Sequence, residues 1–346
     1  MAIYLLSVKA LSRTQGRNVI AAAAYRAGEQ LRDDNDFTSK KTKVHDYRRR
    51  RGVVASGIVL PADAPDNLSD RQTLWNAVER QEKRKDSRVA REVLIALPHE
   101  LSAEERQAVT LKLVSHLVDT YGVGADYAIH APDRHPKADK RNHHAHILIT
   151  TRSIDANGLN PKVVAAFNDK KQGSQTIEAV REAWEGICNN ALEAAQRPER
   201  ISRHTLQVQG IERLPETKQG AIATMRERQG KDSFAAEERQ AVKDYNATLE
   251  QIPEQDGHTE PENATTPIRR KRELNKARSA MRVARKRGKS VSSLLHRKRL
   301  KLRQRLQRQR RRQGERHRLM TAWAKCSGSN GGNINTVHHS YEPPEP

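Results

Sequence analysis

The sequence predicts an α+β domain with a central, mostly antiparallel sheet flanked by helices, followed by a basic helical C-terminal extension. Short apolar runs alternate with amphipathic helical stretches over residues 3 to 196. Two of the apolar runs lie close enough in sequence to pair as a hairpin, and cationic residues gather near the C-terminus. Strands separated by helices, with a hairpin among them, are typical of α+β folds.

The chain begins with a predicted strand and an alanine-rich helix. The strand covers residues 3 to 11, and Asn18 is predicted to cap a helix that runs to about Leu31. The apolar stripe of this helix is formed by Ile20, Ala24, Ala27 and Leu31. Tyr25 falls outside that stripe, so we expect its side chain to point away from the core.

Strands and helices continue to alternate along the middle of the chain. In chain order they are a basic loop at 40 to 51, a strand at 53 to 60, a helix at 70 to 85 and a strand at 89 to 97. A capping box of Ser102 and Glu105 opens the next helix, which ends near Gly122. After two further strands, apolar spacing predicts an amphipathic helix at 176 to 196.

Histidines gather on those two further strands. Alternation in the run 142 to 152 places His144 and His146 on one face of a strand. His130 ends a short strand-like run, and the polar stretch between it and His144 is a plausible hairpin connection. The hairpin would gather three histidines at one end. His143 falls on the opposite face and is structural or DNA-facing, while His135 lies in the connection.

Three neutral imidazoles leave coordination positions open for a substrate, which is typical of a catalytic metal rather than a structural one. Imidazole suits Zn, Mn or Co better than Mg, so the ligand type does not identify the ion. A tyrosine hydroxyl beside such a metal can attack a phosphodiester and store the bond as a phosphotyrosine ester. Strand joining then remains possible.

Tyr25 is the preferred nucleophile in this interpretation, and Tyr47 is its rival. Tyr47 lies in the basic loop, and helices hold reacting groups better than loops do. Glu92, which we place at the start of a strand, is a candidate base or a residue that orients a metal ligand.

Charge is concentrated near the C-terminus. The net charge of the 346-residue chain is +22, and residues 268 to 319 hold many cations but only two acids, Glu273 and Glu315. This segment is predicted to be helical and to bind a polyanion, although a solvated helix face without a partner is the alternative. Residues 253 to 267 have linker composition, and we expect disorder from Ser327 onward.

Several functions are excluded. Cys188 and Cys326 are too few for a disulfide framework or a thiolate metal site, which suits a cytoplasmic protein. Neither a signal peptide nor an apolar run of about 18 residues is present, so membrane insertion is not expected. No nucleotide-driven motor is predicted. Gly288-Lys289-Ser290 resembles the end of a phosphate-binding loop, but Val283 stands where that motif has its first glycine.

Short motifs within residues 1 to 215 resemble those of one known family. They are Ser12-Arg13 with Gly16-Arg17, Ala23-Ala24-Tyr25-Arg26, Glu92-Val93 with Ala96-Leu97-Pro98, His144-Ala145-His146 with Thr150-Thr151-Arg152, Ser202 to Leu206, and Gln209 to Pro215. In this order they resemble the MobA/MobL family of plasmid mobilisation relaxases.

The resemblance implies a HUH-type nicking endonuclease with a relaxase-like fold. Such an enzyme cuts one strand at an origin of transfer, becomes attached to the 5′ phosphate through a tyrosine, and rejoins the strand later. By position, Tyr25 is the nucleophile, Glu92 the motif carboxylate, and His130, His144 and His146 the ligands of Mg or Mn. Single-stranded origin DNA, accessory mobilisation proteins and a type IV secretion coupling protein are the implied partners.

The implied organisation has four parts. They are a relaxase domain at 1–215, a helical segment and linker at 216–267, a basic nucleic-acid-binding extension at 268–320 and a disordered tail at 321–346. DNA contacts are expected from the basic residues Arg13, Arg17, Arg26, Arg152, Arg269, Arg270, Lys271 and Arg272.

Other interpretations remain open. A rolling-circle replication initiator or a HUH transposase would use the same chemistry. In a non-enzymatic nucleic-acid-binding protein, the histidines would hold a structural metal and the basic extension would bind the DNA. A covalent protein–DNA band separates the enzymes from the binder.

Overall fold

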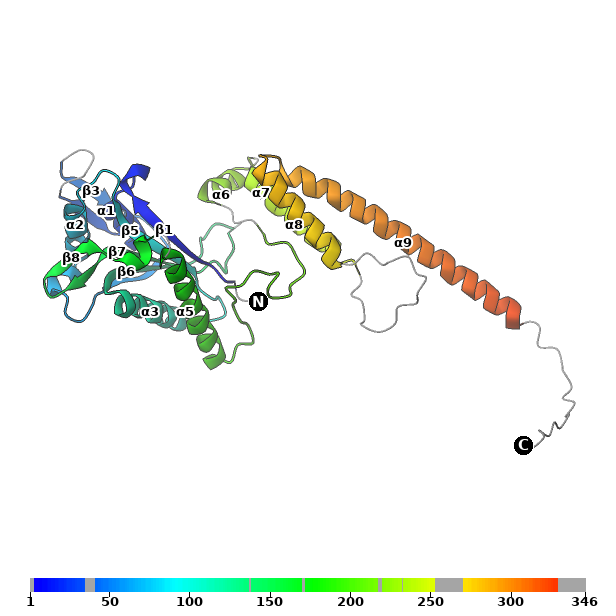
Figure 1. The fold of residues 1–346 in the computed structure, drawn as a ribbon, viewed down its shortest axis with the longest axis horizontal. Helices are drawn as coiled ribbons and strands as arrows, with labels where there is room; N and C mark the ends of the chain where they lie inside the picture. Colours follow the sequence, from blue (N-terminus) through cyan, green and yellow to red (C-terminus); the bar gives the residue numbers. More distant parts are fainter. Residues whose placement is uncertain are drawn as a thin grey trace, which may run out of the picture. The chain divides into compact units, whose positions relative to one another are not determined.

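A computed structural model describes residues 3–34, 41–136, 138–169, 172–216, 220–231, 233–252 and 270–328. The chain divides into two compact units, Met1–Thr205 and Leu206–Pro346. Figure 1 shows the order of their helices and strands along the chain.

The first unit is built on one antiparallel sheet. Its strands are β1 (Leu6–Ser12), β4 (Val53–Val59), β5 (Arg88–Ala96), β6 (Val123–His130), β7 (His144–Asp155) and β8 (Gly158–Val163). The strand order is β1-β5-β7-β6-β4, with β8 paired to β7, and every pair is antiparallel. The predicted α+β class with its antiparallel sheet is confirmed.

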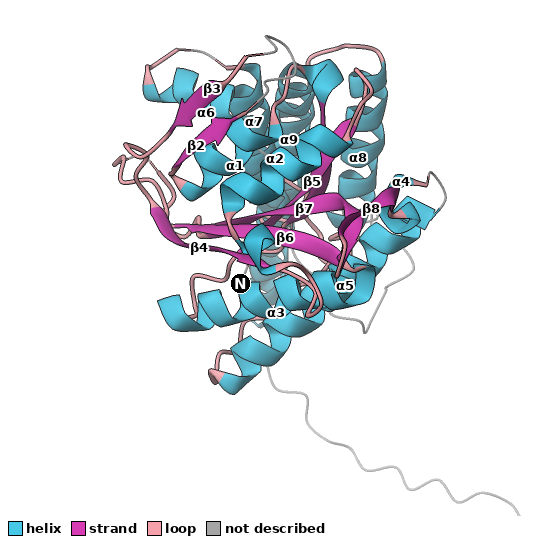
Figure 2. Cartoon of the chain, turned by 90° about the vertical axis from the view of Figure 1, so that its left-hand side faces the viewer, coloured by secondary structure: helices cyan, strands magenta, loops and turns pink. Residues whose placement is uncertain are grey.

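Helices cover both faces of the sheet. On one face lie α3 (Ala103–Tyr121) and α5 (Gln172–Ala194), and on the other lie α1 (Val19–Ala27) and α2 (Arg71–Gln81) (Figure 2). The predicted capping box of Ser102 is present at the start of α3. The smaller elements are β2 (Gln30–Asp33), β3 (Lys43–Asp46), α4 (Ala165–Asn168) and the 3-10 turns Arg13–Gln15 and Asp66–Ser69.

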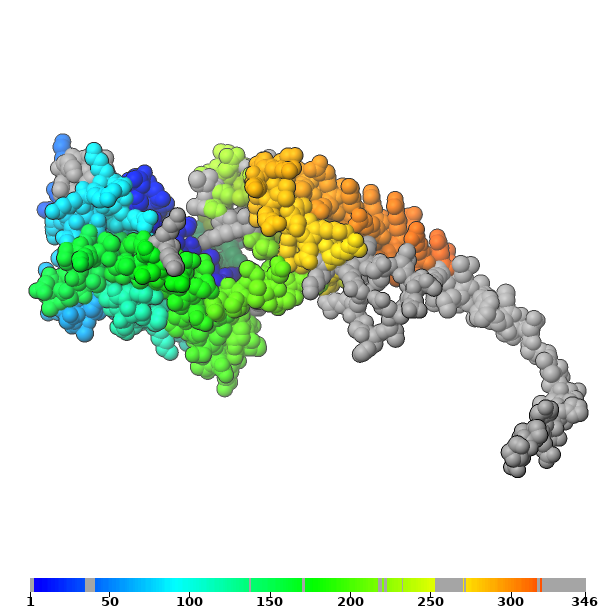
Figure 3. Space-filling view, in the orientation of Figure 1, coloured from blue at the N-terminus to red at the C-terminus, as the bar shows by residue number. Residues whose placement is uncertain are grey.

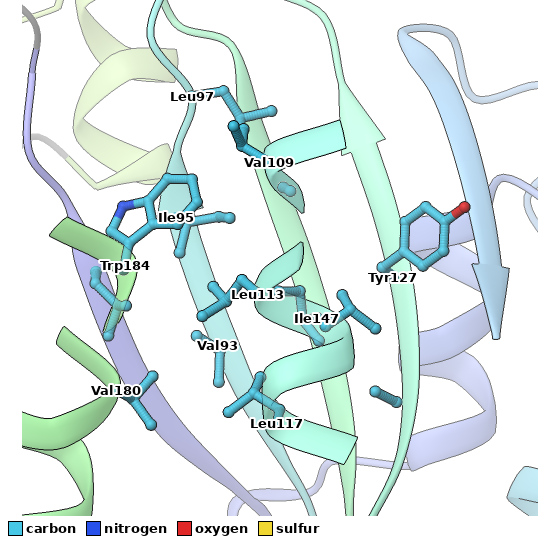
Figure 4. Packing of buried hydrophobic residues seen from close by; sticks show 14 of the residues in the cluster. Val93, Ile95, Leu97, Val109, Leu113, Leu117, Tyr127, Ile147, Val180 and Trp184 are labelled. Carbon is cyan, nitrogen blue, oxygen red and sulfur yellow. The ribbon is translucent and has the colours of Figure 1, made fainter. Parts of the chain in front are cut away.

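Two hydrophobic cores hold these layers together. Leu113 of α3, Trp184 of α5 and Ile147 of β7 are fully buried in the first core (Figure 4). Trp75 of α2 and Leu148 of β7 belong to the second. Because Ile147 and Leu148 are neighbours that face opposite cores, the register of β7 is strongly specified. The same alternation fixes which histidines of β7 share a face.

Three predictions near the site were wrong: the end of the first helix, the absence of a strand from the basic loop, and the place of Glu92 in its strand. The first helix ends at Ala27 rather than near Leu31, because Gly28 adopts a left-handed conformation with φ of 70° and Leu31 then pairs with His45 in the β2–β3 hairpin. The predicted basic loop therefore contains a strand, β3. Glu92 lies in the middle of β5 and not at a strand start, since β5 begins at Arg88, close to the start predicted for the strand at 89 to 97.

The second unit is helical. Its helices are α6 (Ala221–Arg228), α7 (Phe234–Leu249), α8 (Arg270–Lys286) and α9 (Val291–Gly328). Val242 of α7, Leu274 of α8 and Leu295 of α9 are buried in a shared core. The chain turns between α8 and α9 at Gly288, which has φ of 62°.

The basic helical extension predicted for this region is confirmed. It consists of two helices, α8 and α9, with a turn at Gly288 between them. Helix α9 also continues into the predicted tail, as far as Gly328, and residues 315 to 327 contain no glycine or proline that would end a helix. The rest of that tail and the predicted linker at 253 to 267 lie outside the described residues. Within the described part of the chain, no helix is long and apolar enough to cross a membrane.

Candidate metal centre and nucleophile

Three histidines meet at one end of the β6–β7 hairpin. His130 pairs directly with His144, and His146 follows two residues later on the same face of β7. The candidate ligand nitrogens of the three side chains all lie within 4.8 Å of one another. Their ring centroids are 4.9 to 5.3 Å apart. Among the described residues, these three form the group of histidine, cysteine and acidic side chains that could hold a metal ion.

Each histidine ring is oriented by a hydrogen bond from one of its two nitrogens. The three bonds are His146 Nδ1 to Glu92 Oε1 (2.6 Å), His144 Nδ1 to the Asn142 carbonyl (2.9 Å) and His130 Nε2 to the Arg26 carbonyl (2.7 Å). An oxygen acceptor fixes the proton on the nitrogen that faces it, so the other ring nitrogen carries the lone pair. Such hydrogen bonds orient metal-binding histidines in known sites. The three rings therefore suit a divalent cation.

Glu92 is buried and is held by two partners. Arg26 approaches Glu92 Oε1 with Nε at 2.9 Å and Nη2 at 2.8 Å, and His146 approaches the same oxygen. Burial opposes ionisation, but the hydrogen bond from His146 and the charge of Arg26 outweigh it and lower the pKa of Glu92 to about 2. A carboxylate with so low a pKa is a weak base. Of its two predicted roles, orientation of His146 fits this geometry.

His130 is kept neutral by its surroundings. Burial lowers the pKa of His130 to about 3, and nearby His146 and Arg50 act in the same direction. The neutral imidazole is the form that binds a metal. His143 lies outside the cluster, where its carbonyl accepts a hydrogen bond from the Leu97 amide. His135 lies in the β6–β7 connection, also outside the cluster.

Tyr25 is on the exposed side of α1, as its position off the apolar stripe predicts. Its side chain is 47% exposed. The Arg50 guanidinium lies 3.7 Å over the Tyr25 ring, and Arg50 Nη2 is 3.3 Å from His130 Nδ1. One side chain thus connects the candidate nucleophile to a candidate metal ligand. Arg50 was not predicted as a site residue, and the basic composition of its loop is the one sequence feature that could have indicated it.

Tyr47, the rival nucleophile, has a packing role. Its ring meets the Tyr25 ring edge-on with centroids 5.3 Å apart, and it is partly buried against the second core. Its backbone also joins the turn that carries Arg50, since the Arg50 amide donates to the Tyr47 carbonyl at 2.8 Å.

Three arginines predicted to contact DNA are instead engaged within the fold. The Arg13 side chain is 5% exposed and pairs with Glu79, and Arg152 pairs with Glu82. Arg26 is committed to Glu92. Each of these guanidinium groups is paired with a carboxylate, so a DNA phosphate would have to compete with that ion pair.

The other predicted DNA contacts differ in their surroundings. Arg17 and Arg272 are exposed, whereas Arg270 donates hydrogen bonds to carbonyls at the end of α7. Lys271 belongs to α8, and Arg269 lies outside the described residues.

A second buried network supports the strand that carries His130. Arg71 of α2 binds Asp126 of β6 through Nε and Nη2 at 2.9 to 3.0 Å, and Trp75 Nε1 donates to the same carboxylate at 2.8 Å. Arg71 also pairs with Glu29, which follows α1. The sequence analysis missed this network, because nothing local in the sequence relates these positions.

The fold and the site together define a class of protein. It is an α+β domain that presents a three-histidine centre suited to a divalent metal, beside a solvent-exposed tyrosine on a helix.

Comparison with known proteins identifies the family. The MobA/MobL family profile matches residues 17 to 229, which is more than half of the chain, so the chain belongs to that family. Mobilization protein MobL of Acidithiobacillus ferridurans is 35% identical over 257 residues, covering 67% of this chain and 66% of that protein. A probable mobilization protein MobA of Bifidobacterium longum is 27% identical, covering 73% of this chain and 49% of that protein.

One solved protein structure is similar to this chain in both sequence and fold. It comes from work on the molecular basis of vancomycin resistance transfer in Staphylococcus aureus and is 28% identical, with a TM-score of 0.50. The similarity covers 59% of this chain and all of that one. The matched region thus spans about two thirds of the MobL relative and about half of the MobA relative.

Proposed function

We propose that this protein is a DNA relaxase that nicks one strand at a plasmid origin of transfer and rejoins it after transfer. One observation carries the proposal: the exposed Tyr25 is linked through the Arg50 guanidinium to a cluster of three oriented histidines. Membership of the MobA/MobL family and similarity to mobilization proteins support it.

Tyr25 would act as the nucleophile. Its hydroxyl oxygen attacks the phosphorus, the bond from phosphorus to the 3′ oxygen breaks, and a 5′-phosphotyrosine ester forms. Because the side chain is about half exposed, water can take the phenolic proton, and the leaving 3′ oxygen takes up a proton. One phosphate ester replaces another, so attack by a 3′ hydroxyl on the phosphotyrosine restores the strand.

His130, His144 and His146 would hold a divalent metal. Resemblance to the family favours Mg or Mn, and imidazole ligands also suit Zn or Co. A bound ion supplies positive charge to a phosphoryl oxygen of the DNA. Glu92, Arg26 and the Asn142 carbonyl keep the three imidazoles turned toward one point.

The second unit would bind DNA without sequence preference. Helices α8 and α9 carry many exposed cations, and neutralising phosphates releases counterions. Single-stranded origin DNA is the proposed substrate, and accessory mobilisation proteins and a type IV secretion coupling protein are the proposed partners. In this assignment residues 1–215 nick and join, and residues 268–320 extend the contact with DNA.

A single experiment tests the central proposal. The full-length protein is incubated with single-stranded DNA carrying the origin of its own plasmid, with Mg or with Mn, and denaturing electrophoresis follows. We expect a covalent protein–DNA band that protease treatment removes. A protein that binds this DNA but forms no adduct with either ion is a non-enzymatic binder, and the proposal fails.

A further inference from the structure

Arg50 lies beside the candidate site and differs from most of the arginines held within the first unit. Four of those pair with carboxylates: Arg13 with Glu79, Arg26 with Glu92, Arg71 with Asp126 and Arg152 with Glu82. Among the residues that the structure describes, no acidic side chain forms an ion pair with Arg50. Its positive charge beside the candidate site is therefore not neutralised by those residues.

The hydrogen-bonding groups of Arg50 are also incompletely used. Its Nη2 approaches His130 Nδ1 at 3.3 Å, and its guanidinium lies over the Tyr25 ring. Its Nε is buried and has no hydrogen-bond partner among the described residues. A guanidinium carries five N–H donors, so several remain for an anion at the Tyr25 side of the histidine cluster.

The turn that carries Arg50 is held firmly against the end of α1. At Gly28, which caps α1, a Cβ atom would lie 3.2 Å from Val53 Cγ2 and 3.9 Å from the Arg50 carbonyl. The backbone of the turn is closed by the hydrogen bond from the Arg50 amide to Tyr47. Arg50 is thus positioned by packing and backbone geometry, although it comes from a loop.

We propose that Arg50 is a catalytic residue that binds the phosphate attacked by Tyr25. The inference rests on the proposed function and adds a residue to it. An arginine fork matches two oxygens of a phosphate, and a fixed cation stabilises the charge that develops there as the new ester bond forms. Its stacking on Tyr25 would bring the phosphate and the nucleophile together.

The first test compares three variants with the wild-type protein. Arg50→Gln should slow single-turnover adduct formation at saturating origin DNA by about 100-fold or more, as loss of one transition-state donor does. Arg50→Lys should recover part of that loss, because it keeps the charge but not the fork. Arg48→Gln is the matched control: Arg48 is two residues away, exposed and paired with Asp46. It should react at the wild-type rate.

Two further measurements separate phosphate binding from a structural role. Titration with Mn²⁺ should give an affinity in Arg50→Gln that is no lower than in the wild type, because the Arg50 cation faces the His130 nitrogen left for the metal. A loss of affinity in Arg50→Gln would mean that Arg50 acts through His130. Once the wild-type adduct has mapped the nicked position, a methylphosphonate there removes one phosphate charge. This substitution should slow the wild type more than Arg50→Gln, since coupled partners are not additive.

Equal slowing of both proteins by the methylphosphonate overturns the inference, as does an Arg50→Gln variant that reacts at the wild-type rate. In either case the proposed function stands, because the wild type still forms the adduct. A wild-type protein without an adduct overturns the proposed function, and the role of Arg50 with it.

Discussion

The two units use arginine in different ways. In the first unit, Arg13, Arg26, Arg71 and Arg152 are each held inside the fold by a carboxylate. In α9, a row of arginines is exposed instead, and the orange side chains of this helix lie on the surface in Figure 3. That row includes Arg303, Arg308, Arg311 and Arg312.

The difference shows that a basic residue in the sequence does not by itself indicate a DNA contact. A buried guanidinium without a partner is costly, and the first unit pairs four of those that it encloses with carboxylates. Arg50 and Arg91 have no carboxylate partner among the described residues, and of these two it is Arg50 whose charge lies beside the candidate nucleophile. The comparison therefore leads us to expect the proposed chemistry in the first unit and polyanion binding by the second, and both expectations can be tested.

Replacing Tyr25 should have the largest effect. Tyr25→Phe removes the attacking oxygen, so covalent attachment to origin DNA should be abolished, while thermal unfolding should be nearly unchanged because the side chain is 47% exposed. Tyr47→Phe is the control and should still form the adduct. Adduct formation by Tyr25→Phe would contradict the assignment of the nucleophile.

Breaking a buried ion pair should strongly destabilise the first unit. Arg71→Gln leaves Asp126 buried without its cation, which should cost about 3 to 5 kcal/mol of unfolding free energy in urea titrations. Arg17→Gln, at an exposed position, should change it by no more than about 0.5 kcal/mol. If both variants are equally stable, the contrast between paired and exposed arginines has no energetic basis.

Removing the carboxylate that orients His146 should weaken metal binding. Glu92→Ala should reduce the affinity for Mn²⁺, measured by calorimetry, by about 10- to 100-fold. Glu104→Gln, on the exposed first turn of α3, serves as the control. Unchanged affinity in Glu92→Ala would show that the cluster does not depend on this hydrogen bond.

Neutralising the exposed row on α9 should alter salt dependence but not chemistry. Changing Arg303, Arg308, Arg311 and Arg312 to Gln should lower the slope of log affinity against log salt by about 0.7 for each lost phosphate contact. Nicking of a short oligonucleotide at low salt should persist. Deletion of the helices is a poorer test, because Leu302 and Leu306 of α9 are buried in the core shared with α7. An unchanged slope would argue against DNA binding by α9.

The smallest effect expected is a loss of stability on mild acidification. Burial lowers the pKa of His130 in the folded protein to about 3, whereas its ordinary value is 6.5. Between these two pH values, His130 is protonated in the unfolded chain and neutral in the folded protein. Stability of the metal-free protein should thus fall as the pH drops below 6.5, by about 1 kcal/mol per unit at first. The slope should be smaller in His130→Gln, measured by denaturant titration in chelator. Equal slopes would mean that His130 is not protected from protonation.

The sequence alone determined those features that depend on local periodicity. Alternation along β7 placed His144 and His146 on one face, and the helical repeat turned Tyr25 away from the core. The polar stretch from Ala131 to Arg141 was a plausible hairpin connection that would return His130 beside them. The antiparallel sheet and the basic helices followed from the same kind of pattern. Gly28 is also a local signal for the end of α1. The prediction instead followed the apolar stripe, which continues to Leu31, and placed the end of the helix too late.

Only the tertiary structure decided which charges meet. Arg26 and Glu92 are 66 residues apart, as are Arg13 and Glu79, and no local pattern relates them. Their pairing depends on how α1 and α2 pack against the sheet. The same packing brings Arg50 between Tyr25 and His130, and it reveals Glu92 as the partner of His146 rather than a residue at a strand start. Periodicity sets which way a side chain points, whereas long-range packing sets what it points at.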